Sequence, residues 1–135
     1  MGLDMYLTGE KYLWAKFKDD DTPDNIIEDG FRVKERRLEI GYWRKHPNLH
    51  SYIVNTFAGG IDECQEIQLS GENMLQIINA VTNNILPQTS GFFFGTSNGS
   101  KEEIQRDLAI LTKALEWLKT PEVGVSRSIV YRASW

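Results

Sequence analysis

The segment IGYWRKHPNLHSYI, residues 40–53, gathers side chains that bind anions, stack on planar groups and carry protons. Arg44 and Lys45 carry positive charges just ahead of Pro47, and proline is favoured at the first position of a helix. A helix start presents unpaired amides and a positive dipole end. Trp43 would add a stacking surface and His50 a polar contact. These four residues therefore predict an anion-binding or nucleotide-binding edge.

Other interpretations of the same segment stay open. Tyr42 and Trp43 alternate along a predicted strand, so one is typical of a core and the other of a sheet surface, with the two cations only solubilising a loop. The edge is also compatible with contact to a protein partner. His46 and His50 lie four residues apart and can share a helix face, but no acidic residue accompanies them in the sequence. We therefore predict no metal site and no cofactor.

A glycine-rich stretch, PQTSGFFFGTSNGS at residues 87–100, is the second candidate. A loop between a strand and a capped helix can hold a phosphate with its backbone amides. Gly95, Thr96 and Ser97 are lesser candidates for ligand contact, and Gln88 joins them if the preceding strand borders a cleft. No lysine directly follows the last glycine as a P-loop requires, so an ordinary turn is the alternative.

Cys64 and an acidic segment complete the chemically notable residues. Cys64 is the only cysteine, which excludes an internal disulfide and fits a reducing compartment. The carboxylates beside it oppose the nucleophilic thiolate, so we predict a buried structural thiol. The acidic segment at about 18–30 is predicted to be an exposed loop, or else a loop that presents carboxylates to a basic partner.

Apolar periodicity predicts the elements that must position these residues. Strand-like alternation favours the following: a hairpin over 3–17 that turns at Gly9 and Glu10, and strands at 31–43, 64–70, 91–95 and 125–135. Helical spacing favours a helix at 47–57, a second that opens at Ser70 and ends before Pro87, and a third that Ser100 and Glu103 cap. The order predicts an α+β fold, a mainly antiparallel sheet with about three helices packed on it.

Two finer expectations concern the sheet. In the 31–43 strand, Leu38, Ile40 and Tyr42 are expected on one face and Trp43 on the other. Asp4 is expected to meet Arg127 or Arg132 if the first and last strands are neighbours.

Bulk properties bound the classes of function. A chain of 135 residues with 41% apolar residues fits one domain over 1–135. The formal net charge is −4, so no global basic field attracts nucleic acid or lipid. No apolar run approaches the roughly 20 residues that span a bilayer, and no secretory signal opens the chain. We expect a cytoplasmic protein without a membrane partner, for which nucleic acid is a poor candidate ligand; the oligomeric state stays open.

Five segments in a fixed order resemble one known family. They are MGLDMYL, GYWRK followed by LH, DEC, LP-T-GFFFG and VYRASW, and they spread over most of the chain. The family comprises small proteins of bacteria, especially actinobacteria, and of their phages, and it has no established reaction. Two departures stand out. Gln88 and Thr89 exchange the family's order LPTQ, and SNGSKEE replaces an aromatic-rich YDxWY, which puts in doubt any ligand contact made by those aromatics.

The resemblance implies a compact cytosolic protein of bacterial or phage origin. Our leading prediction is a non-enzymatic binding protein that engages a host protein or sequesters a small anionic, nucleotide-like ligand, with counter-defence as a natural setting. The alternative is a small enzyme acting on a nucleotide or phosphoester, with His46 or His50 as acid–base and Arg44 neutralising phosphate. The sequence reveals no set of nucleophile, base and orienting residue, so no catalytic residue is predicted. A third possibility is an interaction protein that uses the acidic loop or a sheet edge.

Overall fold

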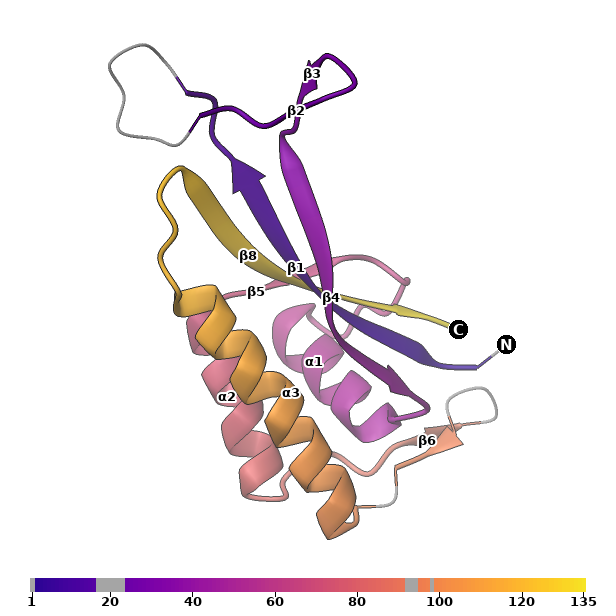
Figure 1. The fold of residues 1–135 in the computed structure, drawn as a ribbon. Helices are drawn as coiled ribbons and strands as arrows, with labels where there is room; N and C mark the ends of the chain where they lie inside the picture. The colour runs from indigo at the N-terminus through magenta and orange to yellow at the C-terminus, as the bar shows by residue number, and fades with distance from the viewer. Residues whose placement is uncertain (1, 17–23, 92–94, 98) are drawn as a thin grey trace.

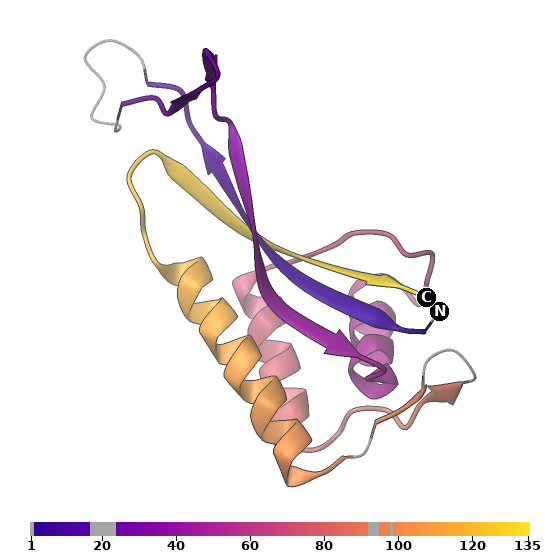
Figure 2. The ribbon, with the colours of Figure 1, turned by 45° about the vertical axis from the view of Figure 1, so that its right-hand side comes forward.

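The chain folds as α+β, as predicted: one antiparallel sheet with three helices on one side of it (Figures 1 and 2). This is a computed structural model, and it describes residues 2–16, 24–91, 95–97 and 99–135. The sheet has the strand order β4-β1-β8-β5, formed by Glu35–Arg44, Asp4–Leu13, Val125–Ser134 and Ile67–Leu69. Two short pairs flank it: β2 (Ile27–Glu28) with β3 (Phe31–Arg32), and β6 (Ser90–Gly91) with β7 (Gly95–Thr96).

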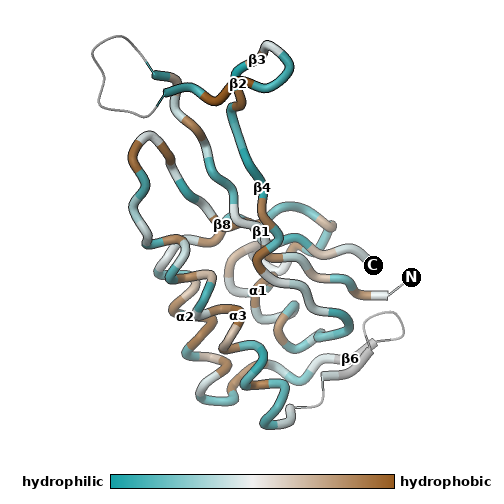
Figure 3. The backbone as a smooth tube through the Cα atoms, in the orientation of Figure 1, coloured by the Kyte–Doolittle hydropathy of each residue, from teal (hydrophilic) through white to brown (hydrophobic). Residues whose placement is uncertain are grey.

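The helices are α1 (Pro47–Phe57), α2 (Gly71–Thr82) and α3 (Lys101–Lys119). All three sequence-predicted helices are thus confirmed. Ser70 and Ser100 cap α2 and α3 through their side chains, which accept from the backbone N–H three residues later. Hydrophobic and hydrophilic stretches alternate along both helices (Figure 3). α3 packs on β4 and β8, and α2 packs on β5 and on α3. The core between helices and sheet includes Leu3, Met5, Leu7, Met74, Ile77, Leu111, Ile129 and Tyr131.

The predicted hairpin at Gly9 is wrong, because β1 runs through that residue without turning. A Cβ added to Gly9 would lie 2.5 Å from Ile40 Cδ1 and 2.8 Å from Trp117 Cη2. The glycine therefore serves close packing of the sheet against α3 and not a change of direction.

The expected faces of β4 are confirmed for Tyr42 and Trp43 and wrong for Ile40. Tyr42 and Trp43 point to opposite faces, with Trp43 2% exposed and Tyr42 43% exposed, but Ile40 packs against the core and does not share the exposed face of Tyr42. The register shifts here: Leu7 pairs with Gly41 and the next residue, Thr8, pairs with Glu39. Ile40 is left as an extra residue, a β-bulge that interrupts simple alternation along the strand.

The two ends of the chain lie side by side in the sheet, because β1 pairs with β8 over its full length. The predicted strands at 64–70 and 125–135 correspond to β5 and β8. The expected contact between Asp4 and an arginine of β8 is wrong. Antiparallel pairing places Asp4 opposite Ser134, and its carboxylate accepts a hydrogen bond from Tyr42 of β4 instead.

Two further segments can be compared with the sequence predictions: the expected strand at 91–95 and the acidic segment at 18–30. A single strand over 91–95 is wrong, since Gly91 of β6 and Gly95 of β7 pair with each other; residues 92–94 lie outside the described part of the chain. Residues 18–23 of the acidic segment also lie outside it, and residues 24–30 are exposed, as expected. None of the described helices has the length and apolar character needed to cross a membrane.

Candidate functional site

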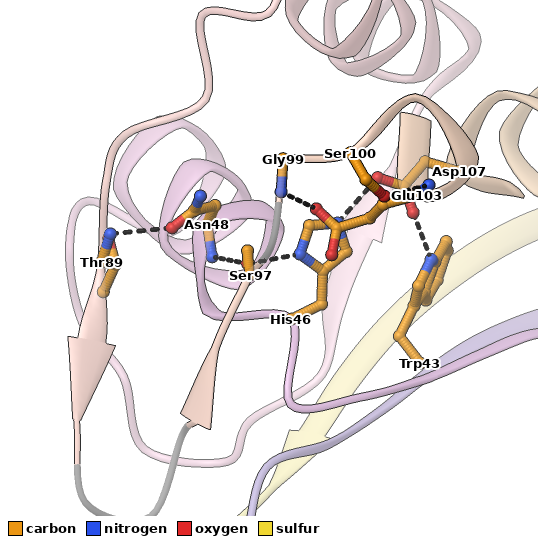
Figure 4. Close-up of polar contacts among 9 residues, drawn as sticks. All are labelled: Trp43, His46, Asn48, Thr89, Ser97, Gly99, Ser100, Glu103 and Asp107. Atoms are coloured by element: carbon orange, nitrogen blue, oxygen red, sulfur yellow. Dashed lines mark hydrogen bonds and ion pairs between the residues drawn. The ribbon is translucent and has the colours of Figure 1, made fainter. Parts of the chain in front are cut away.

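A buried histidine at the junction of β4 and α1 organises the most polar part of the interior (Figure 4). His46 is the N-cap residue of α1 and is 1% exposed. Its Nδ1 lies 2.6 Å from Ser97 Oγ, and its Nε2 lies 2.7 Å from Asp107 Oδ2. Both ring nitrogens are therefore hydrogen-bonded, one to the residue that follows β7 and one to a residue of α3. We call Trp43, His46, Ser97, Glu103 and Asp107 the His46 network.

Asp107 joins this histidine to the sheet. The indole Nε1 of Trp43 donates to Asp107 Oδ1 at 2.9 Å, so each carboxylate oxygen has a partner. Asp107 is 1% exposed, and a buried carboxylate is stable only when its oxygens accept hydrogen bonds or pair with a cation. The bonds to Trp43 and His46 supply this at the start of α3.

Ser97, which is distant from α1 in the sequence, caps the first turn of this helix with its side chain. Its Oγ accepts the backbone N–H of Asn48 at 3.1 Å, one of the free donors of the first helical turn. The side chain of Asn48 in turn accepts from the backbone N–H of Thr89 at 2.7 Å. The glycine-rich segment is thereby fixed to α1, and this helix start is already bonded and buried.

Glu103 brings a second carboxylate to the same place. Its Oε1 accepts the backbone N–H of Gly99 at 3.1 Å and lies 3.9 Å from His46 Nε2. Because Glu103 and Asp107 are four residues apart on α3, they share a helix face. Ligand atoms of His46, Glu103 and Asp107 all lie within 4.8 Å of one another, which is the spacing of a metal-binding group.

The Ser97–His46–Asp107 chain has the residue types of a nucleophile, a base and an orienting group. Its setting differs from that of a hydrolase. All three side chains are buried, and the Asn48 amide occupies Ser97 Oγ. The chain of hydrogen bonds links the start of α1 to α3, and through Asp107 and Trp43 to β4.

The second histidine belongs to a separate cluster, which we call the His50 network: His50, Tyr131 and Asp62. His50 Nδ1 lies 2.6 Å from the Tyr131 hydroxyl, and Nε2 lies 2.9 Å from Asp62 Oδ2. The rings of His50 and Tyr131 stack with centroids 5.9 Å apart. Burial, and secondarily the charge of Asp62, raises the pKa of Tyr131 well above the ordinary tyrosine value, so the hydroxyl stays protonated and can donate to His50.

The structure separates the four residues of the predicted edge. Trp43 and His50 are each 2% exposed and belong to the two buried networks, whereas Arg44 and Lys45 lie on the surface. The expectation of an open helix start beside the cations is wrong, because the first turn of α1 is buried and Ser97 binds the Asn48 amide. Lys45 has a left-handed backbone, φ 53°, where the chain turns from β4 into α1.

The second predicted group is also divided. Ser97 is buried in the His46 network, whereas Gln88 is exposed. Gly95 and Thr96 form β7 and pair with β6. Cys64, expected to be buried, is half-buried, and its carbonyl accepts from Arg132. A ligand-binding role for any of the eight predicted residues stays a prediction.

A surface feature lies on the other side of the sheet. Side chains of β4, β1 and β8 that point away from the helices form what we call the open sheet face: Asp4, Tyr6, Thr8, Arg37, Glu39, Tyr42, Arg44, Val130 and Arg132. The rings of Tyr6 and Tyr42 lie 5.3 Å apart at its centre. Arg44 is opposite Asp4, and Arg132 is opposite Tyr6. An open hollow lies among Tyr6, Arg37 and Arg132.

Sequence reasoning missed four residues of these sites: Asp62, Tyr131, Glu103 as more than a cap, and Asp107. Asp107 left a signal in the sequence. It lies three residues after Ile104 and four before Leu111, on the apolar stripe of α3. A charged residue on such a stripe is buried against a partner, so its position alone indicates an internal polar contact.

Comparison with known proteins adds no relative. No family model matches the chain, and neither a curated protein nor a solved structure matches it.

Proposed function

We propose that this chain is a non-enzymatic binding protein that engages a partner protein through its open sheet face. The observation that carries the proposal is the Tyr6–Tyr42 pair, flanked by Arg44 and Arg132, on a sheet that has all its helices on the other side. Tyrosine and arginine are the residues that most often anchor protein interfaces, because they combine apolar area with hydrogen bonding.

The charges of this face favour a protein over a phosphate-bearing ligand. Arg37 bridges Glu10 and Glu66, each at 3.0 Å. Arg44 lies 4.0 Å from Asp4, so its charge is also partly balanced. Nucleic acid and nucleotides need an excess of positive charge to balance phosphate, whereas a mixed pattern of both signs complements another protein surface.

The enzyme alternative has less support. Both nitrogens of His46 and both nitrogens of His50 are hydrogen-bonded to buried or half-buried side chains. A general acid or base must reach the substrate with one of these nitrogens. On the sequence resemblance alone, we extend the proposal to a bacterial or phage protein that acts in the cytoplasm on a host protein, with counter-defence as the setting.

Affinity capture with matched variants tests the proposal. The immobilised chain is exposed to bacterial lysate as wild type and as Tyr42→Ala or Arg44→Glu. The controls are Leu75→Ala, which also truncates a large exposed side chain, and Lys113→Glu, which also reverses a positive charge; they lie on α2 and α3. We expect a protein that wild type and both controls retain and that both variants of the open sheet face lose.

Two results would contradict the proposal. Equal capture by all five forms would remove the open sheet face from the interaction. A panel of nucleotides that raises the melting temperature, with the shift lost in Arg44→Glu, would favour the anionic ligand instead, because a ligand that prefers the native state stabilises it.

A further inference from the structure

We propose that His46, Glu103 and Asp107 form a binding site for one divalent transition-metal ion, with Zn²⁺ as the best-fitting ion. These three side chains come from two elements, the start of α1 and the first two turns of α3 (Figure 4). Their ligand atoms lie within 4.8 Å of one another. Within the described part of the chain, no other group of three such side chains is this close. This site does not depend on the open sheet face.

The balance of charge supports a cation. Two carboxylates, Glu103 and Asp107, lie beside the His46 imidazole; Asp107 and His46 are 1% exposed and Glu103 is 10% exposed. Buried carboxylates are stable when they pair with a cation or coordinate a metal. A protonated His46 would balance one of the two negative charges. A divalent ion balances both and leaves the imidazole neutral.

Each proposed ligand is already held by an additional hydrogen bond. Asp107 accepts from Trp43 with the oxygen that does not face His46, and Glu103 accepts from Gly99. His46 offers Nε2 to the site while Nδ1 contacts Ser97. Such outer contacts orient metal ligands in known sites.

The Ser97 hydroxyl allows His46 to change tautomer when a metal ion binds. In the metal-free chain, an ionised Asp107 can only accept, so Nε2–H donates a hydrogen bond to it and Nδ1 is left to accept from the Ser97 hydroxyl. A metal needs Nε2 free of its proton, so the proton must move to Nδ1. A hydroxyl both donates and accepts hydrogen bonds. Ser97 Oγ can therefore accept from Nδ1–H in the metal-bound state, and the ring keeps its partner in both tautomers.

The distances suit a tetrahedral ion after small side-chain shifts. Zinc with bonds of about 2.0–2.1 Å holds its ligand atoms roughly 3.3 Å apart. His46 Nε2 is 2.7 Å from Asp107 Oδ2 and 3.9 Å from Glu103 Oε1, values on either side of that spacing. One imidazole nitrogen with two carboxylates suits Zn²⁺ or Mn²⁺, whereas Ca²⁺ and Mg²⁺ prefer all-oxygen sites. A water would complete the coordination beside Glu103, the most exposed of the three.

Metal titration of the full chain tests the site. The chain is stripped with a chelator and dialysed, and Zn²⁺ binding is followed by calorimetry and by thermal unfolding. We expect one Zn²⁺ per chain, a higher melting temperature, and no comparable effect of Ca²⁺. Binding of Ca²⁺ as tight as that of Zn²⁺ would overturn the assignment, as would the absence of stoichiometric Zn²⁺ binding.

Variants locate the binding. Glu103→Gln keeps an oxygen that can accept from Gly99 but removes the charged ligand, so we expect at least tenfold weaker Zn²⁺ binding. The adjacent exposed Glu102→Gln makes the same charge change and should bind like wild type. Cys64→Ser removes the lone thiol and should also bind like wild type. Unchanged affinity in Glu103→Gln, or lost affinity in Cys64→Ser, would place the ion elsewhere and overturn the proposal.

A spectroscopic measurement covers the case in which Glu103→Gln does not fold. Co²⁺ replaces Zn²⁺ in tetrahedral sites and then absorbs strongly in the visible range, whereas six-coordinate aqueous Co²⁺ absorbs weakly. Strong absorption by the stoichiometric Co²⁺ complex of wild type, removed by competing Zn²⁺, supports the site. Weak absorption overturns it.

Discussion

His46 and His50 lie four residues apart at the start of α1, and both are buried. Both are hydrogen-bonded through both ring nitrogens, but the side chains that contact them differ. His46 faces two carboxylates of α3, whereas His50 faces one carboxylate and a neutral phenol. The His50 network has one carboxylate for its imidazole, whereas the His46 network has two. Identical residue types at helical spacing therefore gain their chemical character from the elements packed against them.

The largest effect is expected from Asp107→Ala. This change removes the acceptor of both Trp43 and His46 and leaves two buried donors unpaired. We expect the free energy of unfolding to fall by about 3–5 kcal/mol, measured by urea denaturation. Asp107→Asn is the matched control: its amide can accept from Trp43 and donate to His46 in the other tautomer, so a smaller loss is expected. Equal losses would mean that charge, not bonding, stabilises this network.

Tyr131→Phe tests the other network. It leaves the Nδ1 of buried His50 without its hydroxyl partner, and we expect a loss of about 1–2 kcal/mol in the free energy of unfolding. Tyr6→Phe removes a hydroxyl from the exposed sheet face and should change stability by less than about 0.5 kcal/mol. If the two variants were equally stable, the His50 network would not contribute to the fold.

Alkaline pH distinguishes the two networks, because Tyr131 belongs to the His50 network and the His46 network contains no tyrosine. Burial raises the pKa of Tyr131 in the folded chain above 10, its ordinary value. The unfolded chain then loses this proton before the folded chain does. The stabilisation that comes from the Tyr131 proton is therefore fully present below pH 10. As pH rises further, the loss of this stabilisation lowers the free energy of unfolding by up to about 1.4 kcal/mol per pH unit. Denaturation curves of Tyr131→Phe should fall less steeply over the same range, whereas Asp107→Asn should keep the wild-type slope.

The smallest stability effect is expected at the open sheet face. Tyr42 donates to Asp4, and this bond raises the pKa of Tyr42, but both groups are in contact with solvent. Tyr42→Ala should leave the free energy of unfolding nearly unchanged while abolishing partner capture. A large loss of stability would show that this residue supports the fold and would end its use as an interface probe.

The helices followed from local signals. Ser70 and Ser100 accept backbone donors three residues away, and the apolar spacing of α2 and α3 repeats within a few turns. The α+β class followed from the order of such elements. Gly9 shows the limit of local signals, because the same residue type is typical of a turn and of close packing. Only the side chains of Ile40 and Trp117, from distant segments, decide between the two.

The candidate sites depended on contacts that the sequence does not encode locally. His46 meets Asp107 across 61 residues, and His50 meets Tyr131 across 81. These pairings follow from strand register, from the bulge at Ile40 and from the packing of α3, each of which is fixed by many distant contacts at once. The sequence by itself determined the elements and the residue types available for chemistry. The tertiary structure alone decided which of them are buried together, because hydrogen bonding and charge balance depend on separation in space and not along the chain.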